Sequence, residues 1–317
     1  MAACLLAAGS TRANGRFPLA NRLAIHPNDP SHLLVGATFG LLESRDGGST
    51  FSWGCEAVLG LADQEDPMIV ITDSGTAVFA TFNGIVTSRD GCDYRTPPEF
   101  AGEIIPDVAL SPGVPDQVFA FRTASRSGGF DSELLRSDDA GESWQVVGPP
   151  LPEYLLPLTV DVSKSDPQRI YLTARLDRSR DYVSVLLRSD DGGLTFSETR
   201  IPGTQGQRFA FIGGVHPEDP DRIYLRVDDN VGTPVLRSVD GGASFETIFT
   251  GTGRLLGFAL AGNGETLALG GPSDGIWSGP ADALEQRSTL GPTCLRFHGN
   301  VLYACADFTQ TDFSLGR

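Results

Sequence analysis

The sequence predicts an all-β protein, a β-propeller built from four-stranded blades. A short motif, Ser-x-Asp-x-Gly-x-[Ser/Thr]-aromatic, places aspartates at positions 46, 90, 139, 191 and 240 of the 317 residues. The resulting gaps of 44, 49, 52 and 49 residues are typical of repeat arrays, most often propellers. A second marker, a Pro-Asp turn followed by a short apolar run, recurs between the copies. The 38 glycines and 21 prolines suit the many turns of such a fold.

The motif has the chemistry of a hairpin turn. Its Asp carboxylate can accept hydrogen bonds from the backbone N–H groups that follow, while Gly takes a positive φ. The aromatic residue then starts the next strand and is expected to pack inward. The four intact copies consist of Ser44, Asp46, Gly48 and Phe51; Ser137, Asp139, Gly141 and Trp144; Ser189, Asp191, Gly193 and Phe196; and Ser238, Asp240, Gly242 and Phe245. A fifth, damaged copy has Ser88, Asp90 and Tyr94 and is one residue short before its aromatic.

This motif is the Asp-box, and the chain resembles the BNR/Asp-box β-propeller superfamily of sialidases, sortilin-type receptor ectodomains, xyloglucanases and photosystem II assembly factors. The resemblance covers nearly the whole chain and implies the propeller fold. It also implies that the motif residues are structural, because in these families the turns lie on the rim, away from the active cleft. The superfamily contains both hydrolases and binding proteins, so the resemblance does not decide the function.

Each unit is predicted to run strand, Pro-Asp turn, strand, loop, strand, motif turn, strand. The first turn of unit one contains His26-Pro27, and that of unit five contains His216-Pro217. Proline fixes φ where no ladder hydrogen bond is needed. Because the two histidines occupy equivalent places, we interpret them as turn residues rather than ligands. The predicted units span residues 17–60, 66–100, 104–150, 157–202, 207–252 and 254–290.

Units two and six depart from this plan. Tighter turns at 72–75 and 261–264 replace the Pro-Asp marker, and unit six has lost its motif at 275–280. Residues 291–317 then begin a seventh unit, with predicted strands at 293–297 and 301–305. We therefore expect a seven-bladed propeller with an incomplete last blade; the alternative is six blades followed by a C-terminal hairpin.

The charge and hydropathy of the chain exclude several partners. Lys and Arg total 24 against 40 Asp and Glu, which gives a formal net charge of −16. Such a surface repels nucleic acid and anionic lipid headgroups. No apolar run approaches the length of a membrane span. We expect one propeller domain, residues 17–317, that acts as a monomer.

The N-terminus and the cysteines favour an extracytoplasmic protein, either secreted or periplasmic. Residues 1–16 are predicted to be a truncated signal-peptide-like segment or a disordered N-terminus, because they are small and apolar and contain a Thr-x-Ala step. We predict disulfides Cys55–Cys92 and Cys294–Cys305, with Cys4 removed or unpaired; the alternative is buried free thiols. No metal or cofactor is expected, since no Cys-x-x-Cys spacing occurs and the four histidines are scattered.

No catalytic residue can be named from the sequence. A sialidase needs three converging arginines and a Tyr–Glu nucleophile, and only Arg16 before Phe17-Pro18 faintly matches. An inverting glycosidase needs two carboxylates facing each other across a cleft. The acidic clusters are interpreted as solvated loops: Asp63, Glu65 and Asp66; Asp131 and Glu133; Asp228 and Asp229.

The sequence therefore favours a non-enzymatic propeller that binds a protein or carbohydrate ligand on one face and acts as a binding or scaffold module. Insertions at 122–132, 174–183 and 227–233 interrupt the middle strands of consecutive units and are expected to form one side of the binding surface. One alternative is a glycoside hydrolase of sialidase-like or endoglucanase-like type, which would show a carboxylate pair with one raised pKa. Another is an extracytoplasmic assembly factor for a membrane complex.

Overall fold

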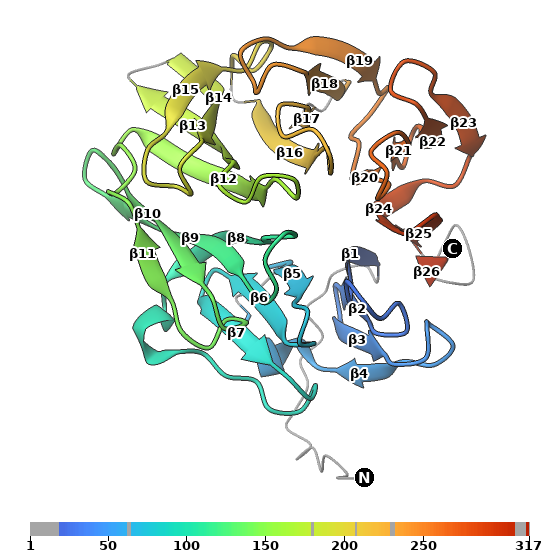
Figure 1. Ribbon diagram of the computed structural model, residues 1–317. Coiled ribbons are helices and arrows are strands. Elements are labelled where there is room, and N and C mark those ends of the chain that lie inside the picture. The colour runs from blue at the N-terminus through green and yellow to red at the C-terminus, as the bar shows by residue number, and fades with distance from the viewer. Residues whose placement is uncertain are drawn as a thin grey trace.

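The computed structural model is a ring of antiparallel β-sheets around a common axis (Figure 1), so the predicted all-β propeller is confirmed. The structure describes residues 19–61, 65–178, 181–206, 208–228, 232–307 and 315–316. The predicted N-terminal segment, Cys4 and Arg16 lie outside these residues. Among the described residues, no helix has the length and apolar character needed to cross a membrane.

Seven sheets make up the described part of the chain, five with four strands and two with three. The first sheet contains β1 (Ala20–Ile25), β2 (Leu33–Ala37), β3 (Gly40–Ser44) and β4 (Ser52–Gly54), and the second β5 (Met68–Ile71), β6 (Ala77–Thr81) and β7 (Gly84–Ser88). The third contains β8 (Ile104–Leu110), β9 (Val118–Arg126), β10 (Gly129–Ser137) and β11 (Gln145–Val147), and the fourth β12 (Leu155–Val162), β13 (Ile170–Arg178), β14 (Asp181–Ser189) and β15 (Ser197–Arg200). The fifth contains β16 (Phe209–Val215), β17 (Ile223–Asp228), β18 (Pro234–Ser238) and β19 (Glu246–Thr250), and the sixth β20 (Gly257–Leu260), β21 (Leu267–Gly271), β22 (Gly275–Gly279) and β23 (Glu285–Ser288). The last contains β24 (Pro292–His298), β25 (Val301–Ala306) and β26 (Leu315–Gly316); the short 3-10 helices are η1 (Glu56–Leu59) and η2 (Pro98–Phe100).

The first strand of every sheet is the innermost one, and these strands close the ring. Each innermost strand contacts the next one around the ring, in the order β1, β5, β8, β12, β16, β20 and β24. The ring closes where β24 contacts β1 (Figure 1). Each sheet therefore has two neighbours, and its apolar side chains can be buried on both faces.

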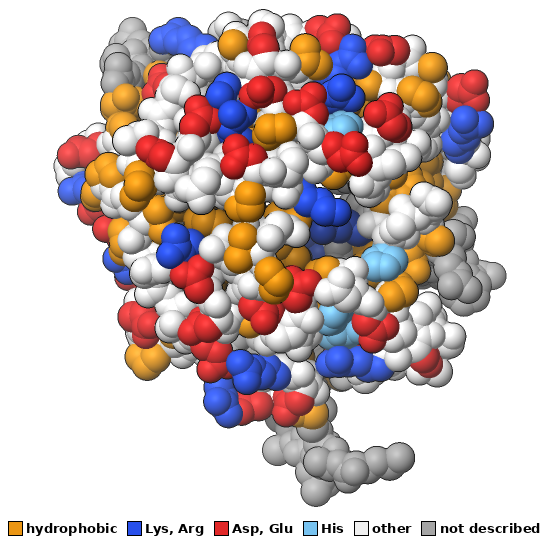
Figure 2. All heavy atoms as spheres, in the orientation of Figure 1, with side chains coloured by type: hydrophobic (Ala, Val, Ile, Leu, Met, Phe, Trp, Pro, Cys, Tyr) orange, Lys and Arg blue, Asp and Glu red, His pale blue; other side chains and the backbone are white. Residues whose placement is uncertain are grey.

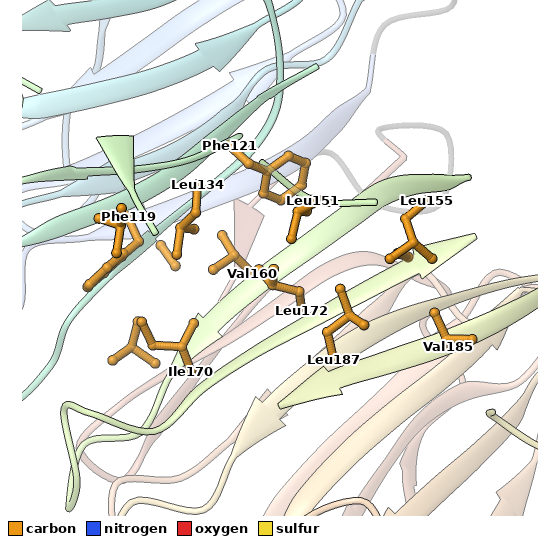
Figure 3. Packing of buried hydrophobic residues seen from close by; sticks show 14 of the residues in the cluster. Phe119, Phe121, Leu134, Leu151, Leu155, Val160, Ile170, Leu172, Val185 and Leu187 are labelled. Carbon is orange, nitrogen blue, oxygen red and sulfur yellow. The ribbon is translucent and has the colours of Figure 1, made fainter. Parts of the chain in front are cut away.

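The core lies between neighbouring sheets. Figure 3 shows one such junction, where Phe119, Phe121 and Leu134 from β9 and β10 meet Val160 and Leu172 from β12 and β13. All five side chains are at most 5% exposed. Burial of large apolar side chains between sheets is the main source of stability in such a repeat fold.

The insertions predicted at 122–132 and 174–183 do not interrupt strands. They lengthen the β9–β10 and β13–β14 hairpins, whose strands have nine residues each. Strands β9 and β10 pair without a register shift from Val118↔Ser137 to Arg126↔Gly129. The insertion at 227–233 lies partly outside the described residues.

One predicted disulfide is present and one prediction is wrong. Cys294 on β24 and Cys305 on β25 are joined, with an S–S distance of 2.06 Å. Cys55 is a free cysteine, whereas Cys92 is disulfide-bonded without it. Cys92 lies in the damaged motif turn, and Cys55 follows β4, which carries the chain away from the motif-turn edge of the ring. Two cysteines at opposite edges cannot meet the short Cα separation of a disulfide.

Candidate functional site

The intact motif turns hold their aspartates in a fixed set of hydrogen bonds. In the fourth sheet the Asp191 carboxylate accepts from the Thr195 N–H at 2.9 Å, the Thr195 hydroxyl at 2.6 Å and the Ser189 hydroxyl at 2.8 Å. These donors, the threonine hydroxyl first, lower the pKa of Asp191 to about 2, and an equivalent set lowers that of Asp240 to about 2. Carboxylates bound in this way stay ionised and stabilise their own turns.

The damaged turn is a reduced version of the same arrangement. Asp90 accepts hydrogen bonds from the N–H groups of Cys92 at 2.9 Å and Asp93 at 2.8 Å. The Ser88 hydroxyl accepts from the Gly91 N–H at 3.1 Å. The shortened spacing thus keeps the backbone contacts of the turn.

His26 and His216 have equivalent places in their turns. The His26 Nδ1 accepts from the N–H groups of Asn28 and Asp29, both at 3.1 Å. The His216 Nδ1 accepts from Glu218 at 3.2 Å and Asp219 at 3.1 Å. Burial lowers the pKa of both histidines, and the neutral ring is the form that can accept these bonds. Both rings are bonded within their own turns through Nδ1.

Most of the acidic residues singled out in the sequence form hydrogen bonds or ion pairs with neighbouring residues. Glu65 is not solvated: it is 8% exposed and accepts a hydrogen bond from the Phe82 N–H. Glu133 pairs with Arg122 at 2.7 Å. Asp131 forms an ion pair with Arg126, and Asp228 forms one with Arg254. Asp63 and Asp229 lie outside the described residues. No cluster of three or more potential metal ligands occurs in the described part of the chain.

Sequence reasoning missed a group of charged side chains around the axis of the ring. We call this group the channel cluster; its members are Arg22 on β1, Asp107 on β8, Asp161 on β12, Arg226 on β17 and Arg296 on β24. Arg22 acts electrostatically on Asp107 and Arg226, and Arg296 acts on Asp161. Figure 2 shows a hollow at the middle of the face, with Lys or Arg side chains inside it. We refer to this hollow as the central channel.

Burial favours the neutral, protonated forms of the two aspartates of the channel cluster. Asp107 is 4% exposed, and its Oδ2 accepts from the Val160 N–H of the next innermost strand at 2.9 Å. Asp161 accepts from the Val162 N–H at 2.9 Å. Burial raises the pKa of Asp107 to about 7 and that of Asp161 to about 6. Desolvation of a carboxylate outweighs the backbone bonds here.

Two arginines of the channel cluster lack ion-pair partners. Within the described part of the chain, no hydrogen bond or ion pair is formed by the guanidinium of Arg226 or Arg296. Burial lowers the pKa of Arg226 to about 10 and also lowers that of Arg296. Arg226 lies over the Phe211 ring at 5.7 Å. A desolvated, unpaired cation favours the approach of an acceptor or an anion.

An aromatic surface lies next to the channel, at the edge opposite the motif turns. We call it the mouth cluster; it consists of Arg175, Tyr182, Phe209 and Phe211. Arg175 lies over the Tyr182 ring at 4.6 Å and over the Phe209 ring at 5.4 Å. Phe209 and Phe211 are stacked with their centroids 6.4 Å apart. Arg175 and Tyr182 come from the extended β13–β14 hairpin, so that insertion places side chains at the channel mouth.

No protein-family model matches this chain, and no curated protein matches its sequence. The chain is similar in fold to an ancestral GH74 enzyme, with a TM-score of 0.67 and 15% identity over 95% of this chain and 46% of that one. It thus spans about half the length of that enzyme. It is also similar to Kuenenia stuttgartiensis hydrazine synthase, with a TM-score of 0.67 and 13% identity over 96% and 97% of the two chains. The third similar structure is YCF48 from Cyanidioschyzon merolae, with a TM-score of 0.58 and 13% identity over 90% and 92%.

At these identities the similarity shows the fold alone: the protein is a β-propeller. The neighbours have different functions by their names, so the function has to be argued from the residues of this chain.

Proposed function

We propose that this protein is a non-enzymatic binding module, secreted or periplasmic, whose protein or glycan ligand docks at the mouth of the central channel. The observation that carries this proposal is the mouth cluster beside the unpaired Arg226. Aromatic side chains and arginine dominate the energetics of protein interfaces because they combine large contact area with directed polar groups. Aromatic faces also stack on sugar rings, so a glycan fits the same surface.

The arginines of the mouth are pre-positioned for a ligand. Arg175 is held between two rings, and Arg226 lies over a third. A guanidinium held by aromatic stacking loses little conformational entropy when it binds an acceptor. The rings are half-buried, so each presents a free part of its surface. A ligand can therefore contact both ring and guanidinium without a rearrangement.

Charge also favours a ligand with acceptor groups. The chain carries a formal charge of −16, yet the channel cluster has three arginines against two aspartates. Since the pKa of Asp107 is about 7, this carboxyl is partly neutral at physiological pH. The channel is thus less negative than the surface around it, which directs carboxylate, carbonyl or hydroxyl groups of a ligand toward it.

Two further parts of the proposal concern the class and location of the protein. The repeated serine, aspartate and glycine contacts support membership of the Asp-box class, with each of the seven sheets as one blade of a single domain, 17–317. The Cys294–Cys305 disulfide supports an oxidising, extracytoplasmic compartment.

The test is binding to peptide and glycan arrays with purified, oxidised protein, followed by variants. We expect Arg175→Gln and Arg226→Gln to weaken binding of any ligand found by about tenfold, or about 1.4 kcal/mol, with little change in melting temperature. Arg287→Gln is the matched control, because Arg287 is an exposed arginine on the outer strand β23. Equal loss in all three variants, or no loss in the first two, would contradict a site at the channel mouth.

A glycoside hydrolase is the second candidate, because the channel holds two carboxyl groups with raised pKa. Asp161 is the more accessible of the two, since Asp107 is 4% exposed and bonded to the Val160 N–H. If the protein is a hydrolase, Asp161→Asn abolishes release of reducing sugar or sialic acid from a substrate panel while Arg287→Gln retains it. A wild-type protein that releases nothing would eliminate this candidate.

A further inference from the structure

At the junction between the fourth and fifth sheets, two buried side chains close the space between the sheets at the motif-turn edge. The Tyr171 hydroxyl donates to the Pro220 carbonyl at 2.7 Å. The Nη1 of Arg169 donates to the Tyr171 hydroxyl at 3.1 Å and to the same carbonyl at 3.4 Å. Arg169 also forms ion pairs with Asp190 and Asp221. Both side chains are buried, Arg169 at 8% exposure and Tyr171 at 0%.

The junction between the third and fourth sheets has the same backbone arrangement but different side chains. Gln117 occupies the place of Arg169, directly before the second strand of its sheet. Phe119 occupies the place of Tyr171, since each pairs in register with the arginine before the motif serine. In both junctions the N–H of a motif-turn glycine donates to a turn carbonyl at 2.9 Å. The remaining equivalent pairs are Arg136 and Arg188, Pro167 and Pro220, Gln168 and Asp221, and Gly192 and Gly241. The guanidinium and the hydroxyl of one junction are therefore missing from the other.

The missing groups leave a pocket, which we call the turn pocket. Its volume is about 190 Å³, and it is lined by the first-named residue of each of these six pairs together with Val147, Asp191 and Leu194. A cavity of about 150 Å³ holds a benzene ring, so the turn pocket has room for a planar group and part of its stem. Leu194 is 55% exposed, so a ligand can reach the pocket from solvent.

Two polar groups of the turn pocket are open to a donor. The Pro220 carbonyl accepts hydrogen bonds from Arg169 and Tyr171, whereas the equivalent Pro167 carbonyl accepts none from the residues that the structure describes. The Gln168 side-chain amide likewise forms no hydrogen bond within the described part of the chain. Polar groups in a half-enclosed site favour the ligand that completes their hydrogen bonds. The turn pocket therefore favours a ligand with several donors.

The charge around the turn pocket favours a cation. Arg136, the basic residue of its lining, already pairs with Asp138 at 3.0 Å. Asp191 stays ionised, because the Thr195 hydroxyl and the other donors of its turn lower its pKa to about 2. Asp191 forms no ion pair with any described residue, and the whole chain has a formal charge of −16. A guanidinium meets both requirements, since it is a planar cation with five N–H donors.

We propose that the turn pocket binds a guanidinium group on an alkyl stem, such as an arginine side chain. The guanidinium would donate to the Pro167 carbonyl and the Gln168 side-chain oxygen, and the stem would pack on Val147 and Leu194. Arg169 shows the corresponding arrangement one sheet further along the chain. The pocket lies at the motif-turn edge, opposite the mouth cluster, and does not depend on the ligand of the channel.

The first test compares small cations in ligand-observed NMR titrations of the full chain. N-acetyl-arginine amide and propylguanidinium carry the proposed group, and N-acetyl-lysine amide carries the same charge on an ammonium. We expect a dissociation constant of about 1 mM for the arginine derivative and about tenfold weaker binding of the lysine derivative. Propylguanidinium that binds as tightly as the arginine derivative assigns the pocket to a small guanidinium compound, and weaker binding assigns it to an arginine of a polypeptide. Equal binding of the arginine and lysine derivatives, or no binding of either guanidinium at about 10 mM, would overturn the proposal.

Two glutamine variants locate the site. Gln117→Arg supplies the guanidinium from the chain itself, as Arg169 does, and we expect it to weaken binding of the arginine derivative by about tenfold. Gln145→Arg is the matched control: Gln117 and Gln145 both donate to Asp138, but Gln145 does not line the turn pocket. Unchanged binding to Gln117→Arg, or an equal loss in both variants, would rule out this pocket. Thermal unfolding of each free variant shows that it folds.

Discussion

Two sheet junctions contain equivalent histidines, His26 and His216, that pack differently against the next sheet. At the first junction, between the sheets β1–β4 and β5–β7, the Nε2 of His26 faces Gly75 in the tight turn of the next sheet. At the other, between β16–β19 and β20–β23, His216 faces Gly264 in the corresponding turn. Both histidines accept two backbone N–H bonds through Nδ1. The repeat has thus preserved the turn, the ring and the glycine opposite it.

The difference lies in how closely ring and glycine approach. A Cβ added at Gly75 would lie 3.6 Å from His26 Nε2, which is ordinary contact, whereas a Cβ at Gly264 would overlap the His216 ring. His216 is 4% exposed, while His26 is half-buried and lies 5.8 Å from the ring of His32. The same local sequence therefore gives close packing of ring against glycine at one junction and a looser contact at the other. The surrounding sheets set the distance between the ring and the glycine.

The largest effect is expected from Gly264→Ala. Gly264 has a φ of +73°, and the added Cβ has no room beside the buried His216. We expect the free energy of unfolding to fall by about 3 kcal/mol, since strain and overpacking add. Gly75→Ala is the matched control: its φ is +87°, but space is available, so a loss of about 1 kcal/mol is expected. Chemical denaturation measures both, and equal losses would show that the two junctions are alike.

Removal of the histidines should have a smaller effect. His216→Ala leaves two turn N–H groups without their acceptor inside a buried site, so we expect a loss of about 2 kcal/mol. His26→Ala leaves the same groups near solvent, where water replaces the ring, and a loss of about 1 kcal/mol is expected. Adding Gly264→Ala to His216→Ala should then cost only the backbone strain. A double variant as damaged as the sum of its parts would refute the steric explanation.

The smallest effect is a pH dependence. The pKa of His216 is lowered in the folded protein, mainly by burial, so the unfolded chain binds a proton first as pH falls. The stabilisation is complete above pH 6.5 and is lost as pH falls through 6.5 toward the lowered pKa. Asp107 acts in the opposite direction, because its pKa is raised to about 7 and its ionisation destabilises the folded state as pH rises.

The difference between wild type and His216→Ala isolates the histidine from this opposing contribution. Urea denaturation from pH 5 to pH 8 should give a difference in unfolding free energy that shrinks below pH 6.5. A difference that stays constant over this range would mean that the ring is not required in its neutral form.

The fold was predictable because its signals are local and repeated. The motif turns depend on contacts within a few residues, such as Thr195 to Asp191, and these can be inferred from spacing alone. The equivalence of His26 and His216 was visible for the same reason. The Cys55–Cys92 pairing failed because it depended on which edge of the ring each cysteine occupies, and the short β4 decides that.

The candidate site was harder to predict because it is assembled across sheets. Asp107, Asp161 and Arg296 are far apart in the chain and come together only when the ring closes. A signal was nevertheless present: each is a charged residue within a mostly apolar innermost strand, as in Ile-Ile-Pro-Asp-Val-Ala-Leu. The expectation that every motif aromatic packs inward is wrong for Phe51, which is 39% exposed, and this could not be foreseen because it depends on packing between sheets.

The hydrogen bonds between innermost strands have a consequence for the width of the channel. Asp107 binds the Val160 N–H of the next sheet, Thr159 accepts from the Ile212 N–H at 3.1 Å, and the Thr293 hydroxyl of β24 donates to the Ala20 carbonyl of β1. An innermost strand held in this way cannot move outward without breaking its hydrogen bond to the innermost strand of the next sheet. The spacing of these innermost strands, and with it the width of the central channel, is therefore fixed by hydrogen bonds that bridge neighbouring sheets.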